Sequence, residues 1–247
     1  MKIEIVVYNI ESAKQAQNGG ADRIELCDNP GEGGTTPSVG VIEEVRKNLS
    51  IEIFVMIRPR GGDFYYAEFE FNAMKRDIEM CKLLNIEGVV FGILKENGDI
   101  DKERCSELIS LARPMKVTCH RAFDMTHDPI GALEDCISLG FDRILTSGHQ
   151  PKAIDGVNLI AELIRQAHNR IIIMPGSGVN ENTVSEIVSK TNATEIHFSA
   201  TAFRDSEMKY RNHDISGIGA EEGSEFNLRT VDPLRVKKIR ALAENSR

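Results

Sequence analysis

The stretch KVTCHRAFDMTHDPIGALEDCISLGFDRILTS, residues 116–147, contains one complete strand–helix–strand unit. Residues 116–120 and 143–146 are short runs rich in β-branched and apolar residues, which is typical of buried strands. Between them, residues 130–139 repeat apolar side chains at helical spacing, after a helix cap at Asp128 and a first-turn proline. Two strands joined through a helix predict a right-handed parallel βαβ unit.

The same alternation occurs eight times in the 247 residues. Eight units predict an α/β protein whose residues 1–247 form one domain, a single (β/α)8 TIM-type barrel. An open doubly wound sheet is the alternative, but it would normally carry a glycine-rich turn after the first strand, and residues 8–11 are Tyr-Asn-Ile-Glu. The expected strands cover residues 3–7, 23–26, 51–57, 88–91, 116–120, 143–146, 170–174 and 195–198, and the expected helices cover residues 10–18, 39–48, 72–84, 102–112, 130–139, 153–167, 181–190 and 233–244.

Composition excludes several classes of protein. Hydrophobic residues make up 41% of the chain and charged residues 28%, which indicates a globular protein and not a disordered one. The apolar runs are far shorter than the roughly 20 residues that cross a bilayer, and the net charge of −8 argues against nucleic acid or a membrane surface as a partner. Five cysteines without a CxxC pair, in a chain with no recognisable export signal, predict reduced thiols and a cytoplasmic protein.

Three of the connections that follow strands are long, at residues 27–38, 58–71 and 199–232. A TIM-type barrel carries its chemistry on these strand-to-helix loops, at the C-terminal face of the strands. We therefore expect the functional site there. The third loop is rich in glycine and charge and could close over such a site.

Polar side chains at the strand ends are candidates for that site. Alternate residues of a strand share a face, so Glu25 and Cys27 point the same way, and His197 has the parity to face inward. His120 is expected to face the barrel mouth with Asp124 close in sequence, an arrangement typical of a general base or a metal ligand. The structural alternatives are that Cys27 is a small buried hydrophobe and His120 a core histidine.

Two features predict an anion site. Arg58 and Arg60 flank a proline after the third expected strand and could clamp a carboxylate or phosphate. The alternative is that both arginines hold acidic residues at the barrel top. Two glycine-containing loops follow the sixth and seventh expected strands, Ser147-Gly148 and Gly176-Ser177-Gly178. Backbone N–H groups in such loops can bind phosphate. The alternative is that the glycines only permit a sharp turn from strand to helix.

The strand-end motifs in combination resemble those of the copper-homeostasis CutC family, which is distinct from the glycyl-radical choline lyase of the same name. The resemblance covers essentially the whole chain. It implies a single TIM-type barrel, a cytoplasmic location, homo-oligomers, and a role in copper homeostasis through Cu(I) binding. The motifs are residues 25–27 (ELC), 32–38 (EGGTTPS), 57–64 (IRPRGGDF), 120–124 (HRAFD), 145–148 (LTSG) and 210–212 (YRN).

Three functions remain open from the sequence. In the first, Cys27 is the metal ligand for Cu(I), a metal that prefers thiolates, although residues 6–7 are Val-Val where family members can carry a cysteine pair. The second is a barrel enzyme acting on a small anionic, possibly phosphorylated, substrate, and the third is a non-catalytic oligomeric scaffold. The catalytic set of the enzyme hypothesis is Glu25, Arg58, His120, Asp124 and His197.

Overall fold

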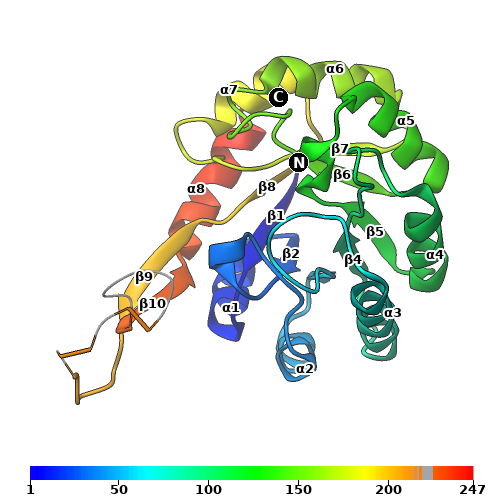
Figure 1. Ribbon diagram of the computed structural model, residues 1–247. Coiled ribbons are helices and arrows are strands. Elements are labelled where there is room, and N and C mark those ends of the chain that lie inside the picture. The colour runs from blue at the N-terminus through cyan, green and yellow to red at the C-terminus, as the bar shows by residue number, and fades with distance from the viewer. Residues whose placement is uncertain (213, 216, 219–224, 247) are drawn as a thin grey trace.

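The computed structural model describes residues 1–212, 214–215, 217–218 and 225–246. Eight parallel strands form one sheet in the order β7-β6-β5-β4-β3-β2-β1-β8. The two outer members, β7 and β8, contact each other, so the sheet curls into a nearly closed barrel with the helices outside it (Figure 1). The predicted TIM-type barrel is confirmed.

Strands and helices alternate in the expected order. The barrel strands are β1 (Lys2–Val7), β2 (Arg23–Leu26), β3 (Glu52–Met56), β4 (Gly88–Phe91), β5 (Lys116–Cys119), β6 (Arg143–Thr146), β7 (Ile172–Pro175) and β8 (Glu195–Phe198). The helices are α1 (Ile10–Asn18), α2 (Val39–Asn48), α3 (Glu68–Leu83), α4 (Lys102–Ala112), α5 (Pro129–Leu139), α6 (Val157–Ala167), α7 (Val184–Thr191) and α8 (Pro233–Glu244), with short 3₁₀ helices at Pro30–Glu32 and Arg121–Met125. No helix in the described part of the chain is both long and apolar enough to cross a membrane.

The strand–helix unit that predicted the fold has the expected caps. The Asp128 side chain accepts a hydrogen bond from the Ile130 N–H at the start of α5, and Gly140 ends that helix in the left-handed conformation with φ 87°. Helix α3 begins four residues earlier than predicted. The Glu70 side chain, accepting from the Ala67 N–H at 2.7 Å, stabilises this extra turn.

Two helices begin later than predicted. Helix α6 starts at Val157 instead of residue 153, and α7 starts at Val184 instead of residue 181. Before α7, the Asn180 side chain accepts from the Asn182 N–H at 2.9 Å, and this side-chain-stabilised turn takes the place of a first helical turn.

Successive residues of each strand point alternately out of the barrel and into it. Ile3, Ile5 and Val7 point outward into the large hydrophobic core between the sheet and the helices. The residues between them point into the barrel, where a much smaller apolar cluster is formed by Cys27, Phe54, Met56 and Val90 with Val6 and Tyr8. Most of the remaining interior is polar, and this polar interior positions the candidate site.

The prediction of a loop at residues 199–232 is partly wrong. It contains two antiparallel strands, β9 (Thr201–Asp205) and β10 (Asn227–Val231), which form a hairpin that projects away from the barrel (Figure 1). The hairpin is held at its base, where the Asn9 side chain donates to the Arg229 carbonyl at 3.0 Å. Residues 213, 216 and 219–224 of the predicted loop lie outside the described residues.

Candidate functional site

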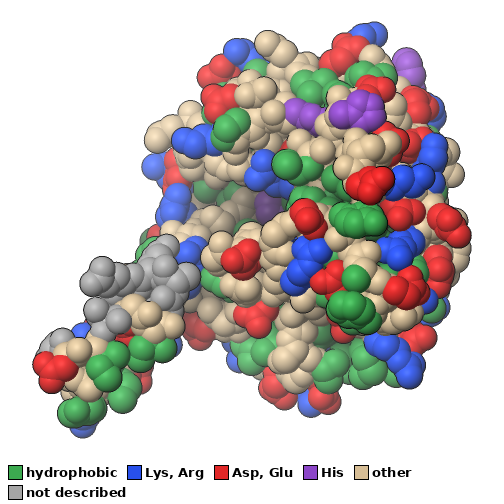
Figure 2. All heavy atoms as spheres, in the orientation of Figure 1, with side chains coloured by type: hydrophobic (Ala, Val, Ile, Leu, Met, Phe, Trp, Pro, Cys, Tyr) green, Lys and Arg blue, Asp and Glu red, His purple; other side chains and the backbone are tan. Residues whose placement is uncertain are grey.

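A cavity of about 220 Å³ opens at the C-terminal end of the barrel strands. In the space-filling view a histidine lies at the bottom of a hollow in the molecule (Figure 2). The cavity combines an apolar wall with ionisable groups, as ligand sites commonly do. Its lining residues are Val6, Tyr8, Glu25, Glu32, Gly33, Met56, Arg58, Phe64, His120, Arg121, Leu145 and His197.

Four of the five predicted catalytic residues line this cavity: Glu25, Arg58, His120 and His197. They come from four different strands or the residues just after them. Each is buried, with between 3% and 7% of its surface exposed. Alternation along the parallel strands thus brings together side chains up to 172 residues apart, as the parity argument predicted.

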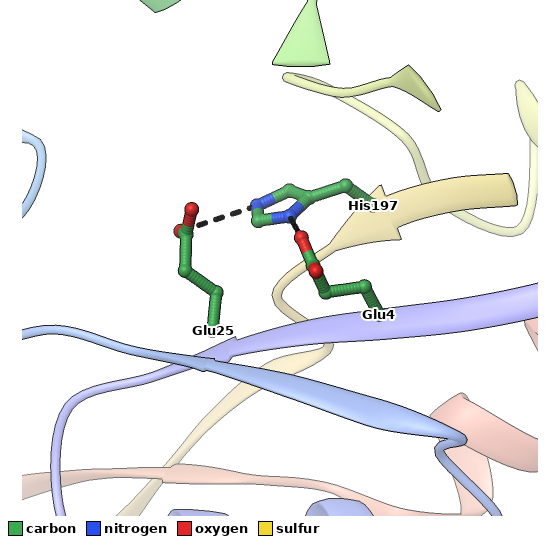
Figure 3. Close-up of side chains that lie close together, drawn as sticks. All are labelled: Glu4, Glu25 and His197. Carbon is green, nitrogen blue, oxygen red and sulfur yellow. Dashed lines mark hydrogen bonds and ion pairs between the residues drawn. The ribbon is translucent and has the colours of Figure 1, made fainter. Parts of the chain in front are cut away.

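His197 lies between two carboxylates (Figure 3). Its Nδ1 is 2.7 Å from Glu4 Oε1, and its Nε2 is 3.9 Å from Glu25 Oε2. Glu4 is in register with both His197 and Arg23 on the neighbouring strands, and its second oxygen accepts from Arg23 Nε. The cluster therefore joins β1, β2 and β8 at the level of the cavity floor.

The surroundings set the protonation of this cluster. Burial opposes ionisation of Glu4, but the charge of Arg23 and the contact with His197 outweigh it and lower the Glu4 pKa to about 2. An ionised Glu4 can only accept, so His197 carries a proton on Nδ1. Burial alone would lower the His197 pKa, yet the two carboxylates raise it above its usual value.

Glu25 behaves differently from Glu4. Burial, with only partial compensation by His197, raises the Glu25 pKa to about 7. Its Oε2 accepts from the Cys27 thiol at 3.5 Å, whereas its Oε1 is buried and lacks a hydrogen-bond partner among the described residues. A carboxyl group that titrates near neutrality and has a free oxygen beside a cavity is suited to accept or donate a proton.

His120 is held as a neutral donor. Its Nδ1 accepts from the Ala122 N–H at 3.2 Å, so the ring proton is on Nε2. Burial and the charge of Arg58 lower its pKa to about 3. Phe64 packs on the ring at 4.8 Å, and Nε2 is buried without a partner among the described residues. Gly92 leaves room for this ring, because a Cβ there would lie 3.0 Å from Nδ1.

Arg58 supplies a positive charge without a counterion. Its terminal nitrogens donate to the carbonyls of Glu32, Gly34 and Gly62 at 2.6–2.8 Å and so tie two loops together. Across the described residues, no carboxylate lies within ion-pair distance of its guanidinium. The structural role predicted as an alternative is present, but through carbonyl oxygens and not through acidic residues.

Cys27 lies beneath the cavity and not on its wall. It is 1% exposed, belongs to the small apolar cluster with Met56, and donates to Glu25. Burial, and then the neighbouring Glu25, raise its pKa well above the usual value, which keeps it a thiol. A Cu(I) ion would have to displace that proton. The thiol of Cys27 and the thioether of Met56 are the soft donors that lie together here.

Other predicted residues lie elsewhere. Asp124 does not orient His120, because the 3₁₀ turn directs its carboxylate toward β6, where it accepts from Arg121 Nε at 2.7 Å and from the Ser147 N–H at 3.0 Å. Arg60 turns outward and pairs with Glu70 at 2.7 Å and with Asp63 at 3.0 Å, which is the structural alternative predicted for it and not the anion clamp.

Of the residues in the predicted glycine loops, Gly176 adjoins one of the four cavity residues: a Cβ there would lie 3.3 Å from the His197 side chain. Ser147 bonds to Asp124, and Gly148 packs tightly on Gly156. The loop at residues 176–178 follows β7, and the Ser177 hydroxyl donates to the Pro151 carbonyl at 2.8 Å. Five residues separate this loop from the start of α7, so it does not adjoin the helix N-terminus as expected.

Sequence reasoning missed a charged layer below the cavity. Arg23 bonds to Glu4 and, at 2.5 Å, to Glu195, which also accepts from Arg143 at 3.1 Å. Arg23 and Arg143 both lie over the Phe54 ring, at 4.6 and 4.9 Å. The sequence did carry a signal for this layer, because its members are charged residues at inward-facing positions of otherwise apolar strands. The same signal identified Glu25.

The sequence matches a known family. The sequence model described as "CutC family" matches residues 1–202. The human "Copper homeostasis protein cutC homolog" is 49% identical over 243 residues, covering 98% of this chain and 89% of the human one. A CutC family protein from Parabacteroides distasonis is 50% identical, covering 95% of this chain and 97% of its own.

Solved structures agree with the fold. The crystal structure of the putative copper homeostasis protein CutC from Streptococcus agalactiae has a TM-score of 0.77 and 34% identity, covering 81% of this chain and 98% of that one. Thiamine phosphate pyrophosphorylase from Pyrococcus furiosus has a TM-score of 0.61 at 14% identity, covering 99% of this chain and 96% of that one, and so shares the barrel alone.

Proposed function

The chain belongs to the CutC family, whose human and mouse members are named for copper homeostasis, and we propose that its barrel-mouth cavity binds a small anionic molecule and carries out acid–base chemistry on it. One observation carries the proposal. Glu25 Oε1, His120 Nε2 and Arg58 Nε are three buried polar atoms without hydrogen-bond partners in the described structure, and their three residues line the same cavity. Buried polar atoms are costly to leave unpaired, and a bound ligand would pair them.

Charge favours an anion as that ligand. Arg58 has only carbonyl partners, so its positive charge is not neutralised, and the adjacent His120 donates through a free N–H. Together they can bind a carboxylate, a phosphate or a polarised carbonyl oxygen. Glu25, with a pKa raised to about 7 by burial, supplies the acid–base group.

Ligand-dependent stabilisation tests the binding step. Melting temperatures are measured for the full chain with and without a panel of sugar phosphates and small carboxylates, for wild type, Arg58→Lys and the exposed control Arg76→Ala. We expect at least one anion to raise the melting temperature of wild type and of the control. Arg58→Lys keeps the charge but loses the fork of donors, so its shift should shrink or vanish.

Two results would contradict the proposal. One is the absence of a shift with every anion up to millimolar concentration. The other is a shift of equal size in Arg58→Lys and wild type, which would leave Arg58 with only its role of joining the two loops.

Cu(I) binding is a second candidate, favoured by the apolar cluster that contains both Cys27, beneath the cavity, and Met56, on its wall. Both are donors that Cu(I) selects. The raised pKa of the thiol opposes binding, so the affinity should be modest and should increase with pH.

Competition with a Cu(I) chelator tests this candidate. The reduced protein is titrated with Cu(I) against bicinchoninate, together with Cys27→Ser, Met56→Leu and the buried control Cys81→Ser. We expect Cys27→Ser to abolish binding and Met56→Leu to weaken it, with the control unchanged. Binding that is indifferent to Cys27 would end the copper assignment at this site.

We also propose that the protein is cytoplasmic and self-associates. All five cysteines are free and buried, as expected in a reducing compartment. The hairpin of β9 and β10 with its connection (the β9–β10 arm) exposes Phe203, Met208, Tyr210 and Leu228, and the strand register places Phe203 and Leu228 on opposite faces, so both faces offer apolar surface to a second chain. Light scattering of wild type and a Phe203→Ser, Leu228→Ser double variant tests the assembly: we expect an oligomer that the double variant shifts toward monomer, and a monomeric wild type would refute it.

A further inference from the structure

The polar atoms that face the cavity differ in kind. Glu25 presents a carboxylate oxygen, Oε1, which can take a proton. His120 presents an N–H, Nε2, whose direction and tautomer are fixed by the Ala122 N–H bond at Nδ1 and by packing against Phe64. One group is a proton acceptor, and the other is the single N–H of a neutral imidazole, because burial and Arg58 lower the pKa of His120 to about 3 and so disfavour its doubly protonated form.

We propose that this cavity catalyses proton transfer at a carbon next to a carbonyl group, with Glu25 as the base and His120 as the donor to the carbonyl oxygen. The inference rests on the proposed function and names its substrate class: a small hydroxy-carbonyl or 2-oxo compound that also carries a carboxylate or phosphate. A neutral imidazole beside a carboxylate base is an arrangement suited to enolisation.

The step balances without a further reactant. Glu25 Oε1 takes the proton from the carbon, and the electron pair of the broken C–H bond forms a C=C bond. The carbonyl π electrons move to oxygen, where His120 Nε2–H and the charge of Arg58 stabilise the enolate. Glu25 then returns the proton to the same or the neighbouring carbon. In the latter case His120 Nε2 gives its proton to the enolate oxygen and takes the proton of the neighbouring hydroxyl group, so that His120 ends as it began and the net change is an isomerisation.

Size and supporting contacts fit this substrate class. A volume of about 220 Å³ corresponds to roughly seven water molecules at about 30 Å³ each, which suits a molecule of a few carbons. The Cys27 thiol holds the other oxygen of Glu25 at 3.5 Å, and His197 Nε2 lies 3.9 Å from it, so the carboxyl group is oriented from behind. Oε1 is thereby left for the substrate.

Glu4, Glu25 and His197 could alternatively bind a divalent metal ion, because their donor atoms lie within 4.8 Å of one another. The electrostatics oppose it. Both oxygens of Glu4 are engaged, one by His197 and one by the fully buried Arg23, so a metal would sit beside a buried cation.

Hydrogen exchange at carbon tests the inference. The full chain is incubated in D2O with dihydroxyacetone phosphate, ribose 5-phosphate, pyruvate and 2-oxoglutarate, and loss of the α C–H signal is followed by NMR, while binding is measured in parallel by thermal shift. We expect faster exchange than in buffer for at least one compound that binds. Glu25→Gln should reduce that exchange by about 10²–10⁴-fold while binding persists, and the exposed control Glu96→Gln should not.

Two further variants keep the test decisive. Glu25→Asp retains a carboxylate, so it should keep measurable exchange even if Glu25→Gln folds poorly. His120→Asn removes the donor to the carbonyl oxygen and should reduce exchange by about 10²-fold. The pH dependence of the remaining exchange should still show the ionisation of Glu25, because the base is still present. A compound that binds but is not exchanged faster than in buffer would overturn this inference and leave anion binding standing. If nothing in the panel binds, the proposed function and this inference both fall.

Discussion

The two polar layers inside the barrel, one at the cavity and one below it, differ in how their polar groups are paired. In the lower layer, Glu4, Arg23, Glu195 and Arg143 are joined by short ion pairs, and both guanidinium groups stack on one aromatic ring. Among the described residues, Arg23 Nη1 is the one buried polar side-chain atom of this layer that lacks a hydrogen-bond partner. In the upper layer, Glu25, His120 and Arg58 each keep a buried polar atom without a partner in the described structure. Once buried, paired charges are costly to separate, whereas unpaired groups at a cavity are available to a ligand.

The layers meet at Glu4 and His197. Arg23 holds Glu4 ionised, Glu4 fixes the proton of His197 on Nδ1, and His197 presents Nε2 to Glu25. The lower layer therefore orients the upper one. The contrast predicts that variants in the two layers will differ in the size of their effects and in the sign of their pH dependence.

The largest effect is expected from Arg23→Met. It leaves Glu4 and Glu195 buried near each other without their shared cation, a change that typically costs about 3–5 kcal/mol. Urea unfolding at pH 7 measures it. The exposed Arg76→Ala variant should leave the midpoint unchanged. If Arg23→Met were as stable as wild type, the lower layer would not be the stabilising element described here.

The pH dependence of stability separates the two layers by sign. The folded-state pKa of Glu25, about 7, lies above its ordinary 4.5, so the folded protein holds a proton that the unfolded chain releases. The free energy of unfolding should therefore fall as pH rises from 4.5 to 7, by on the order of 3 kcal/mol. Glu4, with a pKa of about 2, acts in the opposite sense and contributes stability that is lost as pH falls below 4.5.

Glu25→Gln isolates the upper-layer contribution. Unfolding free energies measured between pH 4.5 and 8 should show a flatter slope in this variant than in wild type or in Glu96→Gln. His197 retains part of the slope, since its own raised pKa also makes stability fall with increasing pH. Identical slopes in Glu25→Gln and wild type would show that Glu25 is not the buried proton carrier.

How far the sequence could anticipate this site depends on where local rules apply. Strand alternation is local, so inward parity correctly placed Glu25, His120 and His197 around one mouth. Arg60 follows Pro59, beyond the strand, where alternation no longer holds, and its side chain turned to Glu70. Asp124 was redirected by a 3₁₀ turn that no spacing rule indicates.

The β9–β10 arm could not be predicted for a different reason. Its strands are joined by 21 residues and not by a tight turn, so the usual hairpin signal is missing. Phe203 and Leu228 are exposed, and the arm packs on little of the protein's own core. The buried ion pairs could not be predicted either. Glu195 is 172 residues from Arg23 in the sequence, so their contact is visible only in the three-dimensional structure.

A smaller effect is expected from Arg58→Lys. An ammonium group cannot reproduce the three carbonyl contacts to Glu32, Gly34 and Gly62, and losing two of them costs about 2 kcal/mol at roughly 1 kcal/mol each. Amide hydrogen exchange should quicken in the two loops that Arg58 joins and stay unchanged in the lower layer. Faster exchange in the lower layer as well would mean that the two layers are not separable.

The smallest effect is expected at the edge of the lower layer, from Glu52→Gln. Glu52 is half exposed, pairs with Lys2 at 2.6 Å, and lies 3.6 Å from Arg23 Nη1, too far for a hydrogen bond. Solvent screens this carboxylate, so its removal should lower the free energy of unfolding by less than about 1 kcal/mol in urea. A loss close to that of Arg23→Met would mean that the paired layer extends to the barrel rim; a small loss confines the stabilising network to the buried pairs of Arg23 and Arg143.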